Sequence, residues 1–278
     1  MIDDIGLKLK ELRTNHNYTK EYVADKTGFT IEEISLVERG EREPSVLWAQ
    51  KFAIALDTTL ENLLIASKIK LLEADTSFVL NEETLLSCGL SKDNLLEAIN
   101  HCYETLGIID HQLEGSGAPK LANLIEYANL SSIIGNLIAE GLVIYSNGKF
   151  TKNLPHTFPD IISTVEGFGG IEIKMAMETN KPKGHLPKPG FYLTLRYVLT
   201  KDDIYIHGKE NRGDTVELWE VKLGYLHEKD FSLSNTEGDS GKTAVIKSDV
   251  LHRMAVVYYN ETLNPYKKIK KYRENNRI

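Results

Sequence analysis

Hydrophobic residues recur at helical spacing through the first 65 residues of the chain. Small polar residues that favour helix starts, and glycines that favour helix ends, separate the apolar groups. The pattern predicts five short helices, whose starts and ends are marked by Gly28, Thr30, Gly40, Ser45 and Thr59. The second and third predicted helices, separated by "TGFT", have the layout of a helix-turn-helix, whose second helix normally enters the DNA major groove.

From residue 95 onward, apolar residues follow helical spacing in some segments and the every-second-residue spacing of strands in others. Residues 95–109 predict one amphipathic helix, and residues 121–143 predict one or two well-buried helices. The Asn147-Gly148 pair inside "VIYSNGKFTK" predicts a β-hairpin. Strands are predicted in "FPDIIS", "GIEIKM", "FYLTLRYVL", "DIYIHG" and "TVELWEVKLGYL". The predicted fold is therefore α+β, with an all-α helix-turn-helix bundle followed by an α/β core that contains a mixed sheet.

These patterns divide the chain into three segments. Residues 1–66 are predicted to form the helix-turn-helix domain, and residues 93–278 the core domain. Residues 67–92, which include "LLEADTSFVLNEETLLSCG", lack a sustained apolar period and predict a linker with a short helix.

Composition and charge narrow the class of protein. An apolar content of 41% and a charged content of 26% are typical of a soluble globular protein. No apolar run reaches the roughly 20 residues that a membrane span needs, and the acidic amino terminus is unlike a signal peptide. Cys88 and Cys102 are too few for a disulfide framework or a zinc site, so we expect a cytoplasmic protein. The net charge of −7 argues against indiscriminate coating of nucleic acid but allows a local basic cleft.

The candidate chemistry lies in "FPDIISTVEGFGGIEIKM", residues 158 to 175. Strand alternation places Glu172 and Lys174 on one face, about 7 Å apart, and the glycine-rich turn can bring Asp160 alongside. Two converging carboxylates are suited to Mg²⁺, and a neighbouring ammonium can orient a water for attack. The alternative is an exposed strand face that carries Glu and Lys for solubility. The chain holds a second such triplet, Glu220-Val221-Lys222, which we interpret as a solvated or cleft-lining strand face because no acid-bearing strand precedes it.

Two basic or donor-rich segments are candidate DNA contacts. Residues 179–200 contain no acid, and their proline-rich start predicts a stiff basic loop that follows phosphates. A second loop, "NTEGDSGKTAVI", offers hydroxyl and ammonium donors. The predicted DNA-binding residues are Lys181, Lys183, His185, Lys188, Ser240, Lys242 and Thr243. The closing "YKKIKKYRENNRI" has six basic residues and one acid, and it is either a further backbone contact or a disordered end.

The first segment resembles the Cro/repressor-like (XRE) helix-turn-helix family over nearly its whole length. The parts that carry the resemblance are "LVERGEREPS" and "ALDTTLENLL". Where that family reads bases, this chain has Ile31, Glu32 and Glu33, and residues 1–66 hold eight Lys plus Arg against twelve Asp plus Glu. The resemblance therefore leaves two roles open, specific DNA contact or a retained scaffold for dimerisation.

The order of helix, "PD", "EIK" and following strands resembles the PD-(D/E)xK nuclease fold. Residues 95–260, including "ANLSSIIGN", "NKPKGHLPKPG" and "TEGDSGKTAVI", resemble type II restriction endonucleases, in particular the ScaI-like group. The resemblance implies a restriction-endonuclease-like core in which Asp160 and Glu172 are metal ligands and Lys174 orients the attacking water. It also implies a further carboxylate from a preceding helix, for which Glu126 and Glu140 are both available.

The function implied is that of a Mg²⁺-dependent type II site-specific deoxyribonuclease fused to a helix-turn-helix domain. Such an enzyme would cut double-stranded DNA at a short palindromic site as a homodimer, because a two-fold site matches a two-fold protein. The alternative is a helix-turn-helix transcriptional regulator or restriction-modification controller with a non-catalytic second domain. A structure-specific repair nuclease is a third possibility, but it would not need long donor-rich loops.

Overall fold

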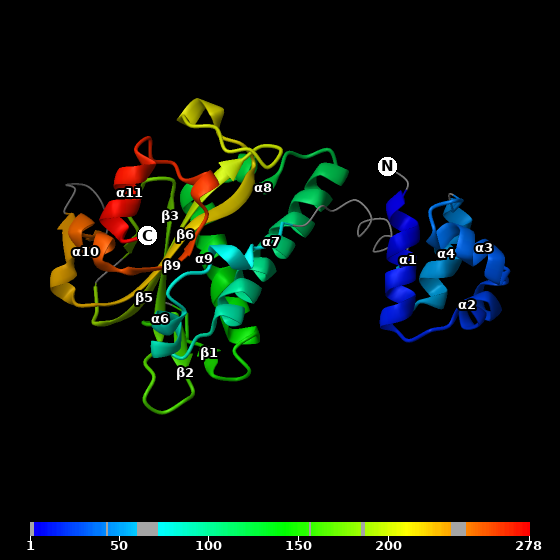
Figure 1. Cartoon of the computed structure of the whole chain (residues 1–278), viewed down its shortest axis with the longest axis horizontal. Helices are drawn as coiled ribbons and strands as arrows, with labels where there is room; N and C mark the ends of the chain where they lie inside the picture. Colours follow the sequence, from blue (N-terminus) through cyan, green and yellow to red (C-terminus); the bar gives the residue numbers. More distant parts are fainter. Residues whose placement is uncertain (1–2, 43, 60–71, 156, 185–186, 235–242) are drawn as a thin grey trace. The chain divides into compact units, whose positions relative to one another are not determined.

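The structure is a computed structural model that describes residues 3–42, 44–59, 72–155, 157–184, 187–234 and 243–278. Contacts between residues divide the chain into two compact units, Met1–Lys70 and Leu71–Ile278 (Figure 1). Each unit has an apolar core of its own.

The described residues of the first unit form four short helices, α1 Asp3–Asn15, α2 Lys20–Thr27, α3 Ile31–Glu38 and α4 Val46–Ala55. Thr19, Thr30 and Ser45 each accept a hydrogen bond from the first turn of the helix that follows, as N-cap residues do. Gly28 ends α2 in the left-handed conformation. The first four helices expected from the sequence are confirmed, and the expected fifth lies outside the described residues.

The apolar faces of these helices meet in one core, formed by Leu9, Val23, Ile34, Val37, Trp48, Phe52, Ala53 and Leu56. A buried ion pair lies at its edge. Glu38 accepts hydrogen bonds from Arg13 Nε at 2.6 Å and from Arg13 Nη2 at 3.1 Å. Because an unpaired buried carboxylate is costly, this pair fastens α3 to α1.

Two long helices form one layer of the second unit, α7 Lys92–Gly115 and α9 Tyr127–Ile144, with α8 Leu121–Leu124 between them. The long helices cross closely, because a Cβ on Gly141 would lie 2.7 Å from Ala98 Cα. By length and composition alone α9 would be able to cross a membrane. Its residues Leu130, Ile134 and Ile138 are instead buried in the core of this unit.

A six-stranded sheet forms the next layer, in the order β1-β2-β3-β5-β6-β9. Its strands are β1 Phe150–Lys152, β2 Ile161–Ser163, β3 Ile171–Met177, β5 Gly190–Thr200, β6 Thr215–Leu226 and β9 Ala255–Tyr259. The strands β3 and β5 are parallel and all other neighbours are antiparallel. The mixed sheet predicted from the sequence is confirmed.

A smaller sheet and two further short helices also belong to this unit. The sheet has the order β4-β8-β7, with β4 Lys183–Gly184, β7 Phe231–Ser234 and β8 Thr243–Ile246. The helices are α10 Ser248–Arg253 and α11 Ile269–Asn276. Single turns of 3₁₀ helix occur at η2 Lys209–Asn211, η3 Glu228–Asp230 and η4 Glu261–Leu263.

The segment predicted as a linker with a short helix is corrected in part: the short helix is present, but residues 72–92 belong to the second unit. Leu85, Cys88 and Leu90 are fully buried in the core of the second unit. The segment also contains η1 Thr76–Phe78 and α6 Glu82–Ser87. It joins the sheet edge as well, because Leu80 N donates to Val257 O at 3.0 Å. Its weak period reflects short elements that bury a few residues each, not a free connection.

Two predicted strand features are also corrected. Residues 143 and 144 belong to α9, so Asn147 and Gly148, both with positive φ, form a helix-to-strand turn and not a hairpin. The segment "DIYIHG" forms only an isolated bridge between Lys201 and Ile204. The turn signal at Asn147-Gly148 is therefore real, but a helix precedes it where the hairpin prediction requires a strand.

The two faces of the large sheet have different neighbours. The helix α9 packs against the face that carries Ile173 and Met175, since a Cβ on Gly135 would lie 3.2 Å from Met175 Cγ. Alternation directs Glu172 and Lys174 to the opposite face. The smaller sheet and α10 pack on that opposite face around Tyr192.

Candidate active site

The candidate site forms where β2 and β3 come together. Asp160 directly precedes β2, Glu172 is the second residue of β3, and Ile161 pairs with Ile171 in antiparallel register. A Cβ on Gly170 would lie 2.4 Å from both Pro159 Cγ and Ile161 O, so only glycine fits there. The glycine-rich turn therefore allows the chain to bring Asp160 beside β3, as the sequence predicts.

Hydrogen bonds connect the three predicted catalytic residues. Asp160 N donates to Glu172 Oε2 at 3.1 Å, and Ile173 N donates to Asp160 Oδ2 at 2.7 Å. Lys174 Nζ donates to the other carboxylate oxygen of Glu172. The side chains of Lys174 and Glu172 are 20% and 12% exposed, so the pair is partly shielded but open to solvent on one side.

Burial and the two neighbouring charged groups shift the pKa of Glu172. Burial raises the pKa of Glu172 above its usual value, the Lys174 ammonium opposes this rise, and the Asp160 charge adds to it. Two carboxylates that are close, partly buried and mutually repulsive are stabilised by a divalent cation. Their oxygens are the ligands that Mg²⁺ prefers, and water or phosphate oxygens can fill its remaining positions. The residues present therefore fit a Mg²⁺ ion.

The third carboxylate expected from a preceding helix is not brought to this pair. Among the residues that the structure describes, no three His, Cys, Asp or Glu side chains are grouped as metal ligands. Glu126 is an exposed residue at the start of α9, and Glu140 lies 3.7 Å from Lys152 on β1. The reason is geometric, since α9 packs on the face of β3 opposite to Glu172.

The basic loop after β3 returns to the candidate site. The strand β4 lies against Lys174, because a Cβ on Gly184 would be 2.6 Å from Lys174 Cε. Further along, Tyr192 Oη donates to Lys188 O at 2.8 Å, and Lys188 Nζ lies 5.5 Å from the centre of the Phe158 ring. The predicted DNA contacts Lys181, Lys183 and Lys188 are exposed on this loop.

The remaining predicted DNA contacts are only partly described. His185, Ser240 and Lys242 lie outside the described residues. Thr243 is half-buried at the start of β8 and pairs with Ser234 of β7. The strand β8 also pairs with β4, which connects Thr243 to the segment that touches Lys174.

The interpretation of the second acid-x-Lys triplet, Glu220-Val221-Lys222, is corrected by the structure. Glu220 and Lys222 are fully buried and not a solvated or cleft-lining strand face. Arg196 Nε donates to Glu220 at 2.5 Å, and Lys222 Nζ donates to Leu251 O at 2.7 Å and to Asn276 Oδ1. Burial lowers the pKa of Lys222 to about 8. The sequence pattern of a polar strand face is the same for both triplets, and only the covering helices α10 and α11 distinguish them.

Comparison with known proteins bears on the first unit. Residues 9–63 match the helix-turn-helix family model. The first unit is a helix-turn-helix domain. Among solved structures, a restriction-modification controller protein, C.AhdI from Aeromonas hydrophila, is 34% identical to this chain, with a TM-score of 0.22. The similarity covers 22% of this chain and 94% of that protein. A comparison with curated proteins gives no match.

Glu32 and Glu33 of the helix-turn-helix domain differ in their contacts. Glu33 accepts a hydrogen bond from Thr30 N at 3.0 Å and completes a capping box at the start of α3. Its other oxygen accepts from Arg42 Nη1 at 3.1 Å. Glu32, by contrast, is exposed on α3. The carboxylate of Glu33 is therefore engaged within the helix-turn-helix domain, whereas that of Glu32 is open to solvent.

Proposed function

We propose that the protein is a Mg²⁺-dependent endonuclease that hydrolyses phosphodiester bonds in double-stranded DNA. The single observation that supports it is the hydrogen-bonded set of Asp160, Glu172 and Lys174 on one face of β2 and β3. A strand face kept polar for solubility has no need of a partly buried carboxylate pair, because burying such groups costs free energy.

Each residue has a distinct role in this proposal. Asp160 and Glu172 hold the ion, and their mutual backbone contacts fix the distance between them. A bound Mg²⁺ would supply positive charge to the phosphoryl oxygen and lower the pKa of a coordinated water. Lys174, which is held by Glu172, would orient the attacking water and favour loss of its proton.

The helix-turn-helix domain binds double-stranded DNA in this proposal and delivers the second unit to its substrate. We infer that the enzyme acts as a homodimer on a short palindromic site, because each active site can then cleave one strand. Exposed Lys181, Lys183 and Lys188 beside the candidate site would contact backbone phosphates. Such a nuclease, belonging to a restriction-modification system, would act in the cytoplasm.

The second candidate function is transcriptional control of a restriction-modification system. The match of residues 9–63 to the helix-turn-helix family favours it, because that domain alone is sufficient for a regulator. The second unit would then serve dimerisation or ligand sensing, and Asp160, Glu172 and Lys174 would have no catalytic role.

Cleavage of plasmid DNA tests the proposal. The purified protein is incubated with plasmid and Mg²⁺, and the fragment ends are sequenced. The decisive variant is Asp160→Asn, whose amide oxygen can still accept the Ile173 N–H but carries no charge. We expect discrete ends from the wild type, none from Asp160→Asn, and a Mg²⁺-dependent rise in Tm only in the wild type.

Asp214→Asn is the matched control, because Asp214 also directly precedes a strand of the same sheet but pairs with Lys120 at 3.0 Å. It should cleave as the wild type does. A wild-type protein that binds a specific DNA sequence and leaves it intact with Mg²⁺ contradicts the nuclease and supports the regulator.

A further inference from the structure

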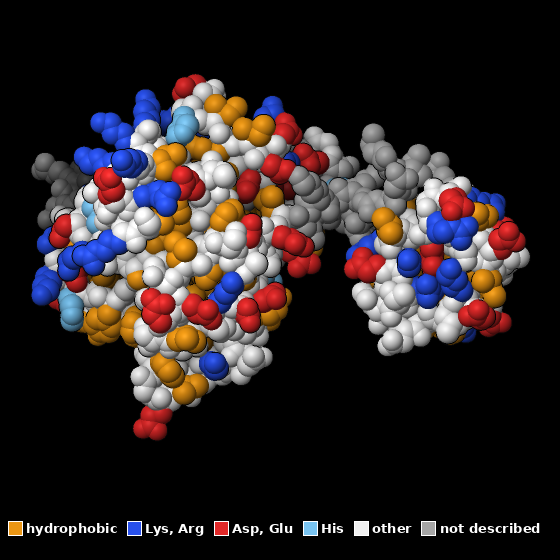
Figure 2. All heavy atoms as spheres, viewed as in Figure 1, with side chains coloured by type: hydrophobic (Ala, Val, Ile, Leu, Met, Phe, Trp, Pro, Cys, Tyr) orange, Lys and Arg blue, Asp and Glu red, His pale blue; other side chains and the backbone are white. Residues whose placement is uncertain are grey.

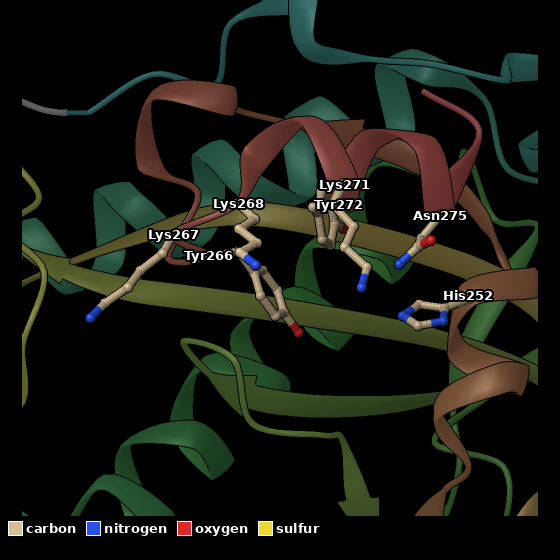
Figure 3. A pocket seen from close by; sticks show the side chains of 7 residues that line it. All are labelled: His252, Tyr266, Lys267, Lys268, Lys271, Tyr272 and Asn275. Atoms are coloured by element: carbon tan, nitrogen blue, oxygen red, sulfur yellow. The ribbon is translucent and has the colours of Figure 1, made fainter.

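The basic end of the chain forms part of a pocket. The helix α11 docks on the second unit through Tyr272 and Asn276, both buried. Between α11 and α10 lies a cavity of about 440 Å³ (Figure 3). Its lining residues are His252, Tyr266, Lys267, Lys268, Lys271, Tyr272 and Asn275. The segment is thus an ordered wall of a cavity and not a free tail.

The lining contains cations and no carboxylate. In the part of the chain that the structure describes, Lys267, Lys268 and Lys271 form no ion pair within 4.0 Å. Figure 2 shows Lys and Arg side chains gathered over the region of the second unit where α11 lies. Unpaired cations around a concave surface favour an anion.

The buried groups beneath the pocket add to its positive charge. Arg196 and Lys222 are both buried there, and Glu220 is the carboxylate that pairs with both. Two cations against one anion leave a net positive charge under the pocket floor. Because buried charges are screened weakly by water, this charge acts on a ligand in the cavity.

The start of α11 faces the same cavity. Lys268 is the N-cap residue, and its side chain makes no capping hydrogen bond. The first backbone N–H groups of a helix need acceptors, and a phosphate at that position supplies them. In Figure 3 the Lys271 ammonium and the His252 ring extend toward a common space from α11 and α10, whereas Lys267 extends away.

Two tyrosines give the pocket a firm aromatic wall. Tyr266 and Tyr272 stack with ring centres 5.0 Å apart, and the buried Arg196 donates to the hydroxyl of each, at 3.0 and 3.3 Å. An aromatic surface beside lysines is the combination that holds a base together with its phosphate.

The pocket and the candidate active site lie on the same face of one sheet. Lys174 of β3 is in register with Thr194 of β5, which is in register with Lys222 of β6. Two strand steps correspond to about 10 Å across the sheet. Lys222 in turn holds Asn276 of α11, next to the pocket residue Asn275.

We propose that this pocket binds the phosphate group of a nucleotide unit, carried either by a nucleic-acid strand or by a free nucleotide. The chemistry is shared by both sources, and the pocket would act as a second anion site beside the candidate active site. Phosphate binding in this pocket does not depend on the proposed nuclease activity. If the protein is instead a transcriptional regulator, the pocket would bind the same group.

Lysine acylation followed by mass spectrometry tests the pocket directly in the full chain. The reaction is carried out in EDTA, so that no metal-dependent cleavage occurs, with a short DNA duplex, a single-stranded oligonucleotide, AMP or inorganic phosphate as the probe. We expect protection of Lys268 and Lys271, and no protection of the exposed Lys149 and Lys209. Protection by the oligonucleotides alone identifies a strand, and equal protection by AMP identifies a free nucleotide.

A binding experiment gives an independent measure. Lys268→Ala/Lys271→Ala should lower affinity for the protecting probe about tenfold or more and, for a DNA probe, reduce the salt slope by about 1 for each phosphate that these lysines neutralise. Lys149→Ala/Lys209→Ala removes the same charge elsewhere in the unit and should leave both unchanged within about twofold.

Absence of protection by every probe overturns the pocket proposal, as does equal weakening in the two double variants. Asp160→Asn should keep full protection of Lys268 and Lys271 in EDTA. The pocket proposal and the nuclease proposal can therefore fail separately.

Discussion

Asp160 donates its backbone N–H to Glu172 Oε2 at 3.1 Å, while its own carboxylate accepts the N–H of Ile173, the residue after Glu172, at 2.7 Å. Each carboxylate is therefore oriented by the backbone of the other's strand. This reciprocal arrangement places two acids side by side, and within the described part of the chain no basic residue forms a salt bridge with Asp160. It is the feature that a metal-dependent reaction would use, and it can be tested one group at a time.

Replacing Lys174 should separate chemistry from DNA binding. In Lys174→Met the side-chain volume is kept and the ammonium is lost, so we expect single-turnover cleavage with Mg²⁺ to fall by roughly 10²-fold or more. DNA affinity measured with Ca²⁺ should change little, because the Lys174 side chain is only 20% exposed and its ammonium is directed to Glu172. Equal losses of rate and affinity would mean that Lys174 is only a phosphate contact.

Gly184 offers a test of the position of Lys174 that leaves all three catalytic side chains in place. A Cβ at residue 184 would lie 2.6 Å from Lys174 Cε, so Gly184→Ala should displace the lysine side chain and slow cleavage. Gly169→Ala is the control, because its Cβ would meet only Phe191 Cδ2 at 3.7 Å, an ordinary contact. Cleavage rates and Tm values of both variants are compared with the wild type. A Gly184→Ala enzyme with the wild-type rate would contradict the assigned role of Lys174.

The buried amine of Lys222 should make stability depend on alkaline pH. Burial lowers its pKa to about 8 from 10.5, so the unfolded chain binds more protons than the folded chain between these values. The free energy of unfolding should therefore rise with pH across this window, by about 3 kcal/mol at most. In Lys222→Met this contribution disappears, and chemical denaturation from pH 7 to 10.5 measures it.

The contribution of Lys222 is the difference between the pH profiles of unfolding free energy of the wild type and Lys222→Met. Burial raises the pKa of Cys88 to about 11 and that of Cys102 to about 12, from 9.0, which lowers stability as pH rises above 9. Both thiols are present in the wild type and in Lys222→Met, so their effect cancels. Identical pH profiles for the two proteins would show that folding does not lower the pKa of Lys222.

The two glutamates at the start of α3 should respond differently to substitution. Glu33→Ala removes one half of the capping box and the contact with Arg42, so it should lower the Tm of the helix-turn-helix domain. Glu32→Ala should leave the Tm unchanged, because the side chain is exposed. The DNA affinity of the Glu32→Ala variant should change less than about fivefold. If Glu32 accepts a hydrogen bond from cytosine N4, the loss of affinity is greater and depends on the base. Thermal melts and binding to base-substituted duplexes distinguish the two residues.

Local signals explain why much of the fold could be predicted. Thr30, Ser45 and Gly28 mark helix ends because their capping geometry involves only neighbouring residues. The alternation of Ile171, Glu172, Ile173 and Lys174 defines the two faces of β3 in the same way. The short turn between β2 and β3 limited where Asp160 could lie, and so the candidate site was predictable as well.

What the sequence determined by itself is the helix-turn-helix domain, the strands β2, β3, β5 and β6 of the mixed sheet, and the neighbourhood of Asp160, Glu172 and Lys174. Only the tertiary structure decided what covers each face. It buries Glu220 and Lys222 under α10 and α11, although their pattern matches that of Glu172 and Lys174. It also places α9 on the face opposite to the carboxylates, which separates Glu126 and Glu140 from them. Periodicity fixes which residues share a face, but the element that packs on that face comes from a distant part of the chain, and its choice depends on the packing of the whole unit.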